Sequence, residues 1–226
     1  TVTDAPTEIL DATHRALREH GYAEVTMQDI ADETDLSKAA IHYHYDCKHD
    51  LLVSFLDHLY EQFEARIDDP DGDTPAERLH ALVDALLVER SETPAFRTAL
   101  LEIKAQAPYD DAFRDRLRRF DDAFSAVVRD LVAEGTADGT FRGDVDPDTV
   151  ASALTTFMNG AQTRHVGAGH PPAASAATLH SYIETALRPQ GRADGDRDGN
   201  AAPNGVGDGS TAPNHGDTGG QAGCAP

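Results

Sequence analysis

The stretch "GYAEVTMQDIADETDLSKAAIHYHYDCKHDLL", Gly21 to Leu52, decides the fold. Its first half predicts a helix, because Thr26 and Asp29 form a capping-box pattern ahead of apolar residues at helical spacing. The turn "TDLS" follows, and Ser37 at its end is a suitable N-cap for a short helix that runs to about Tyr43. Two short helices joined by such a tight turn make a helix-turn-helix, in which the second helix lies in the major groove of DNA.

Helical rather than alternating periodicity also marks the sequence on both sides of this stretch. A helical stripe from Ile9 to His20 precedes it, and Gly21 is a suitable C-terminal stop. A long helix with Asp46 as its N-cap is expected next. Five further amphipathic helices are expected at Pro75–Arg90, Pro94–Ala107, Asp111–Glu134, Pro147–Val166 and Ala173–Leu187. No strand of any length is predicted, so the fold class is all-α with about nine helices.

Composition divides the chain into three parts. Residues 189–226 hold ten of the 18 glycines and no leucine, isoleucine, phenylalanine or tyrosine. Such a segment cannot bury enough apolar surface to offset the entropy lost on ordering, so a disordered Gly/Asp/Pro-rich tail is predicted. We therefore expect a three-helix helix-turn-helix domain at residues 1–50, a larger helical-bundle domain at residues 51–188, and the tail after them.

The chain is strongly acidic. Its 40 Asp and Glu residues against 19 Lys and Arg residues give a formal net charge of −21. Dense carboxylates keep a protein hydrated in molar salt, where screening removes most of their mutual repulsion, so we interpret the composition as a halophilic adaptation. Cys47 and Cys224 make no disulfide framework, and neither a signal peptide nor a membrane-spanning apolar run is found. A cytoplasmic protein with no membrane partner is expected.

No motif of a familiar catalytic site is present. The sequence lacks Gly-x-Ser-x-Gly, a phosphate-cradling glycine loop and His-Glu-x-x-His, so neither an enzyme nor a cofactor is expected. Metal binding is the alternative reading of the histidine-rich segment after Ser37. His42 and His44 diverge by about 200° on a helix, while Cys47 and His49 match no standard zinc spacing. We therefore expect no metal site and interpret the segment as contacting phosphate.

The stretch from Gly21 to Leu52 resembles the signature of the tetracycline-repressor (TetR) family of transcriptional regulators. It carries Gly-aromatic, Thr before the second helix, Ile-Ala within it, Leu-Ser at the turn, an aromatic and His run, then Lys and Leu-Leu. The resemblance implies a sequence-specific DNA-binding regulator, most simply a ligand-responsive homodimeric repressor of a double-stranded operator. The residues that it places against DNA are Thr26, Ser37, Lys38, Ala39, Ala40, His42, Tyr43, His44 and Lys48. A helical protein-interaction module with a degenerate helix-turn-helix is the alternative.

The same resemblance implies that the larger domain forms the homodimer through its last two long helices and binds a small effector. The residues expected at the dimer interface are the small Ala151, Ala153, Gly160 and Ala161, followed by Leu179, Tyr182 and Ile183. The candidate effector site comprises Phe96, Leu100, Ile103, Phe120, Phe124, Phe157, Met158 and Gln162. Its phenylalanine and methionine content predicts a largely apolar ligand. The alternative is that these side chains are ordinary core, as apolar stripes at helical spacing usually are.

DNA binding by so acidic a chain requires that its charges be segregated. Residues 1–50 contain eleven Asp and Glu residues against four Arg and Lys residues. From Leu36 to His49, however, one acid stands beside two lysines and three histidines. A neutral to basic contact face therefore lies on an acidic body, and few phosphate charges are neutralised. Because counterion release is then small, we expect DNA affinity to depend weakly on salt.

Overall fold

The computed structural model describes residues 5–88 and 93–189, which form nine α-helices and contain no strand. The all-α prediction with about nine helices is confirmed. The helices are α1 (Ala5–Glu24), α2 (Met27–Asp32), α3 (Lys38–His44), α4 (Lys48–Ile67), α5 (Pro75–Leu87), α6 (Pro94–Gln106), α7 (Asp111–Asp138), α8 (Pro147–Ala168) and α9 (Pro172–Tyr182), the last continued by a wider turn at Ile183–Leu187. The predicted end at Arg90 and the tail from residue 190 lie outside the described residues.

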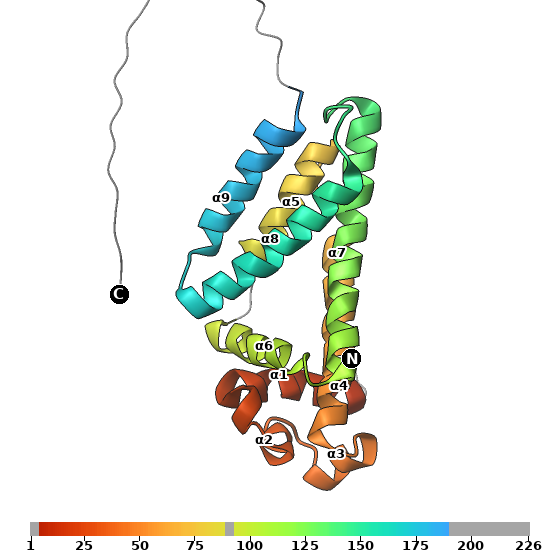
Figure 1. The fold of residues 1–226 in the computed structure, drawn as a ribbon. Coiled ribbons are helices and arrows are strands. Elements are labelled where there is room, and N and C mark those ends of the chain that lie inside the picture. Colours follow the sequence, from red (N-terminus) through yellow and green to blue (C-terminus); the bar gives the residue numbers. More distant parts are fainter. Residues whose placement is uncertain (1–4, 89–92, 190–226) are drawn as a thin grey trace, which may run out of the picture. The chain divides into compact units, whose positions relative to one another are not determined.

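Two groups of helices meet along α4 and α7 (Figure 1). The helices α1, α2 and α3 gather at one end with α6 and the start of α4, whereas α5, α8 and α9 lie beside the other end of α7. The most extensive packing between helices joins α7 to α8, α1 to α6 and α4 to α7. The helix α6 therefore belongs in space with the first helices of the chain, although it follows them by some seventy residues of sequence.

Side-chain caps fix the short helices of the N-terminal group. The Thr26 hydroxyl accepts from the Asp29 amide at 3.3 Å, and the Asp29 carboxylate accepts from the Thr26 amide at 2.8 Å, so the predicted capping box is confirmed. The hydrogen bonds from Thr26 also hold the pKa of Asp29 below its ordinary value. The Ser37 hydroxyl accepts from the Ala40 amide at 3.2 Å, which starts α3 where the sequence predicts.

Some helix ends differ from the prediction. The N-cap of α4 is Cys47 rather than Asp46, and its side chain makes no capping hydrogen bond to the helix. The helix α7 continues past the predicted end at Glu134 and ends at Gly139, which adopts the left-handed conformation with φ 84°. Gly135 lies inside α7 because a β-carbon there would meet the Phe141 ring at 2.3 Å. Its role is close packing, and only the tertiary fold reveals it.

Buried apolar side chains form two clusters. The first joins α1, α2, α3 and the start of α4, and it also contains Phe96, Ile103 and Phe113 from α6 and α7. The second lies among α5, α7, α8 and α9. The helix α4 supplies Phe55 to the first cluster and Ile67 to the second. The helix-turn-helix is thus not an independent bundle, because its core is completed by helices of the larger domain.

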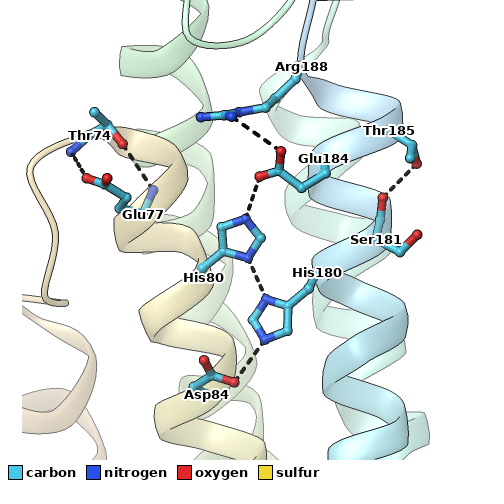
Figure 2. Close-up of polar contacts among 9 residues, drawn as sticks. All are labelled: Thr74, Glu77, His80, Asp84, His180, Ser181, Glu184, Thr185 and Arg188. Atoms are coloured by element: carbon cyan, nitrogen blue, oxygen red, sulfur yellow. Dashed lines mark hydrogen bonds and ion pairs between the residues drawn. The ribbon is translucent and has the colours of Figure 1, made fainter.

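A polar clamp joins α5 to α9 (Figure 2). The Nδ1 atoms of His80 and His180 are 2.5 Å apart, while their Nε2 atoms contact Glu184 at 2.8 Å and Asp84 at 2.9 Å respectively. Because an ionised carboxylate only accepts, each Nε2 carries a proton, and the short Nδ1 contact then needs one proton between the rings. The hydrogen bond from His80 also lowers the pKa of Glu184, which Arg188 contacts at 3.3 Å. The arrangement suits a histidine pair with one positive charge.

Removing the His80 ring should loosen this clamp, because the ring makes both the Nδ1 contact with His180 and the Nε2 contact with Glu184. Losing one hydrogen bond costs about 1 kcal/mol of unfolding free energy, which corresponds to about 2–4 °C in Tm for a chain of this size. We therefore expect His80→Leu to lower Tm by at least this amount. Thermal melts of the native protein and the variant check it, and an unchanged Tm would contradict it.

Candidate DNA-binding surface and ligand cavity

The helix α3 is attached to the body by one apolar side chain and is otherwise turned outward. Ile41 is fully buried, whereas the Tyr43 side chain is 86% exposed. The predicted DNA-facing residues on this segment that are exposed are Ser37, Lys38, Ala39, His42 and His44, and Ala40 is half-buried. A helix held at one point with its polar and aromatic side chains in solvent is free to enter a groove of a partner.

The predicted DNA-facing residues Thr26 and Lys48, which lie away from α3, are both engaged in local structure. The Thr26 hydroxyl accepts from the Asp29 amide and also donates to the Asp29 carboxylate at 2.8 Å. The Lys48 ammonium donates to the Tyr22 carbonyl at 2.8 Å and lies 5.1 Å from the centre of the Tyr22 ring. Burial lowers the pKa of Lys48. Since an ammonium has three donors, two N–H groups of Lys48 remain for a phosphate after the bond to Tyr22 is made.

Three side chains at the start of α4 come close enough to share an ion, which their sequence spacing does not reveal. The nearest ligand atoms of Cys47, His49 and Asp50 all lie within 4.8 Å of one another, and all three residues are exposed. The same side chains also make structural bonds: Cys47 contacts Asp50 at 3.2 Å, and His49 Nε2 contacts Asp110 at 2.7 Å. Asp110 is the N-cap of α7, so His49 joins the start of α4 to the start of α7.

The helix α6 is fixed to the bend at the end of α1. The Glu102 carboxylate accepts from the Tyr22 amide at 2.8 Å, and Ile103 is fully buried in the N-terminal core. Gly21 bends α1 at this point with φ 72°, and a β-carbon there would lie 3.3 Å from a Glu102 oxygen. One face of α6 therefore contacts α1 directly, and through α1 it is linked to the helix-turn-helix.

A cavity of about 480 Å³ lies on another face of α6, where α4, α7 and α8 complete its walls. Of the eight residues predicted for an effector site, six line this cavity: Phe96, Leu100, Phe120, Phe124, Met158 and Gln162. The other two residues, Ile103 and Phe157, are not among the lining residues. Ile103 points to the N-terminal core because it is one residue away from the cavity stripe of α6, and Phe157 packs partly buried against the second core.

The sequence interpretation missed the cations of the cavity. Among the described residues, its lining contains five basic residues and one acid: Arg66, Arg97, Lys104, Arg114, Arg118 and Asp121. Arg97 and Lys104 are half-buried on α6, at the two ends of a stripe that also holds Leu100 and Leu101. The spacing i, i+3, i+4, i+7 of this stripe is visible in the sequence, but its charged ends conceal that it is a lining face.

Polar groups of α8 meet these two cations. The Lys104 ammonium contacts Gln162 Oε1 at 3.3 Å and Asn159 Oδ1 at 3.4 Å, and the Arg97 guanidinium contacts His165 Nε2 at 2.6 Å. The two half-buried cations of the cavity therefore lie between α6 and α8.

No helix in the described ranges, residues 5–88 and 93–189, is long and apolar enough to span a bilayer.

Comparisons with known proteins agree with this geometry. The family described as "Bacterial regulatory proteins, tetR family" matches residues 9–55, and the family described as "BetI-type transcriptional repressor, C-terminal" matches residues 75–188. A crystal structure of a TetR transcription regulator from Haloarcula marismortui is 43% identical, with a TM-score of 0.76 over 81% of this chain and 98% of that one. The transcriptional repressor AcnR of Corynebacterium efficiens is 28% identical over 68% of this chain and 77% of its own.

A further solved structure is similar in fold. It is a transcriptional regulator from Saccharomonospora viridis in complex with choline, 24% identical, with a TM-score of 0.74 over 82% of this chain and 98% of that one.

The two faces of α6 should respond differently to truncation. Ile103→Ala empties a fully buried site and should lower the free energy of unfolding by about 2–5 kcal/mol. Leu100→Ala removes a half-buried side chain that borders the cavity, so we expect a loss of less than about 1.5 kcal/mol, since little new void is created. Urea unfolding in molar potassium chloride measures both. Equal losses would contradict the assignment of the two residues to different faces.

Proposed function

The chain belongs to the TetR family of transcriptional regulators, and from this membership we propose that it is a homodimeric, ligand-responsive repressor that reads operator DNA with α3. The observation that carries the proposal is the outward presentation of α3, with Ile41 as its anchor and Tyr43 in solvent. Residues 1–50 are then the DNA-binding domain, residues 51–188 the dimerisation and effector domain, and the protein acts in the cytoplasm. The relatives named above are transcriptional regulators, and we assign no catalytic role.

The proposed contacts follow from the chemistry of each side chain. Lys38 and the Tyr43 hydroxyl bond phosphate or base acceptors, and the imidazoles of His42 and His44 add donors. The methyl groups of Ala39 and Ala40 suit thymine methyls, so sequence readout depends on apolar contact and DNA shape more than on bidentate pairs. Ser37, Thr26 and Lys48 lie at the margins of this face, where they position the protein on the backbone.

The acidic body sets how the protein meets DNA. Acids concentrate on α1 and α2, whereas the segment from Leu36 to His49 carries one acid and two lysines. The 43% identity to a regulator from Haloarcula supports the halophilic interpretation of this composition. At molar salt the Debye length is about 3 Å, so repulsion between the distant acids and the phosphates is screened while direct contacts survive.

The proposed dimer interface uses the exposed small residues of α8 and α9. On α8 these include Ala153 and Gly160, whereas Ala151 and Ala161 are buried within the chain. The expectation that Leu179 and Ile183 face a partner is wrong, because both are buried in the second core. What α9 exposes is instead small: Ala174, Ala177, Thr178 and Ser181. A two-fold pairing of such faces places two copies of α3 on half-sites about one helical turn of DNA, or a multiple, apart.

Ligand response is proposed to pass through α6. Its cavity stripe, with Arg97 and Lys104 at the ends, shares a rigid helix with Glu102 and Ile103, which grip α1. A ligand that displaces the cavity stripe also displaces Glu102 and Ile103. This displacement changes the spacing of the two α3 helices in a dimer. The effect requires only that the ligand bind one position of α6 more tightly than the other.

A gel shift with the upstream region of the protein's own gene, in high potassium, tests the proposed function. Tyr43→Ala should weaken binding about tenfold, which is about 1.4 kcal/mol, because it removes an exposed contact of α3 without touching the core. The matched control is Tyr109→Ala, since Tyr109 is 89% exposed but lies outside α3. Equal affinity of both variants and the native protein for the operator would overturn the role of α3. Absence of any shifted band would favour the protein-interaction alternative.

The salt dependence of binding provides a second, quantitative test. A dimer presents two copies of Lys38 and Lys48, so about four phosphates are neutralised and the slope of log K against log salt should be about −4 or flatter. Lys38→Gln should flatten it by about 2, because each lysine contributes about 0.9. Fluorescence anisotropy with labelled operator across potassium concentrations gives both values. A slope as steep as about −10 would show that the contact face is more basic than these residues allow.

A further inference from the structure

We propose that the effector is an amphipathic anion, a carboxylate or phosphate on an apolar body, whose acidic group is bound by Lys104 and Arg97. The proposal rests on the ligand-responsive function proposed above and specifies the ligand class of its cavity. It departs from the sequence interpretation of a largely apolar ligand, because the charged lining residues were not recognised there.

The charge balance of the cavity is opposite to that of the chain. The sequence has 40 acidic and 19 basic residues, yet the part of the lining that the structure describes has one acid and five bases. Random sampling of this composition would give an excess of acids. A local reversal of charge in a concave site attracts ligands of the opposite sign, here anions.

The five cations do not contribute equally. Arg66, Arg114 and Arg118 are exposed, and at molar salt their field is screened within about 3 Å. Arg97 and Lys104 are half-buried. Both lie on α6, on a different face from the side chains that pack in the N-terminal core. Screening is weaker for buried groups, so these two supply the binding energy while the exposed three favour entry.

The partners of the inner cations include neutral acceptors that an anion can replace. Gln162 and Asn159 hold the Lys104 ammonium at 3.3 and 3.4 Å, which are long distances, and His165 faces Arg97. A carboxylate adds the attraction between opposite charges to the hydrogen bond, which a neutral amide or imidazole acceptor does not supply. Exchange of amide and imidazole acceptors for a carboxylate therefore favours binding, and it releases α8 side chains from α6.

The cavity also has apolar side chains that suit the body of such a ligand. Its apolar lining from α4 and α7 includes Leu59, Phe63, Leu117, Phe120 and Phe124, and the Phe63 and Phe120 ring centres are 5.2 Å apart. The volume of about 480 Å³ falls within the ~300–1,000 Å³ of pockets for drug-sized ligands. The half-buried cations on α6, together with these apolar side chains of α4 and α7, match a molecule with one charged end.

A quaternary ammonium such as choline, which the Saccharomonospora regulator binds, fits this cavity poorly. Cation recognition uses aromatic faces together with negative charge. The one acid among the described lining residues, Asp121, is exposed and already accepts from Asn159 Nδ2 at 2.8 Å. Arg97 and Lys104 would stand close to the ligand with the same sign of charge, and such juxtaposition costs several kcal/mol across an interface.

Calorimetric titration with probes of one chain length tests the proposal. Decanoate and decyl phosphate should bind, and they distinguish the two acidic groups, whereas 1-decanol, decyltrimethylammonium and choline should bind at least tenfold more weakly. Lys104→Met and Arg97→Met should each weaken the better anion about tenfold or more. Arg129→Met is the matched control, because Arg129 pairs with Asp148 outside the cavity lining. Melting curves verify that the variants are folded. The weak affinity for 1-decanol should be the same in the variants as in the native protein.

The outcomes separate this proposal from the one on which it rests. Binding of the ammonium probes in preference to the anions, equal binding of decanol, or no binding of either anion overturns the anionic ligand. Anion binding that both cavity variants weaken supports it, whatever happens to DNA. If the bound anion leaves the gel shift unchanged, the ligand class stands and the ligand-responsive repressor function fails.

Discussion

The structure depends on α6 being held from two sides. On one side the Glu102 carboxylate takes the Tyr22 amide and Ile103 fills the core of the helix-turn-helix domain. On another side Arg97 and Lys104 border the cavity. A single helix thus completes the packing of one domain and lines the cavity of the other. Because a helix moves as a rigid body over this length, neither side can shift alone.

The acidic composition conflicts with DNA binding only when charge is averaged over the chain. The acids of the N-terminal domain serve local structure, as Asp29 does in the capping box of α2. The exposed face of α3 contains no acid, from Ser37 to Tyr45. The same segregation recurs in the cavity, where cations gather in a chain of net charge −21. In both places the local charge, and not the total, matches the proposed partner.

Local signals made much of the fold predictable. The capping pair Thr26 and Asp29, the N-cap Ser37 and the Asp146–Pro147 start of α8 each act within four residues, and the structure has all of them. What failed depends on packing between distant segments. The sequence pattern predicts Gly135 as a turn residue after α7, whereas it lies inside the helix and leaves room for the Phe141 ring. The cavity cations were missed because sequence periodicity shows that α6 has stripes but not which stripe faces α1.

The interactions that hold α6 contribute a free energy small enough for a ligand to offset. A charge-assisted hydrogen bond such as that between Glu102 and Tyr22 is worth about 1.5–3 kcal/mol, and coupling between two sites in allosteric proteins is typically about 1–3 kcal/mol. Strain on this one bond is therefore enough to change operator affinity by about 5- to 150-fold. The His49–Asp110 contact ties α4 to α7 independently, so α4 holds the helix-turn-helix while α6 moves. We propose that the response takes the form of a pivot about the start of α4, driven through the buried side chains of α6.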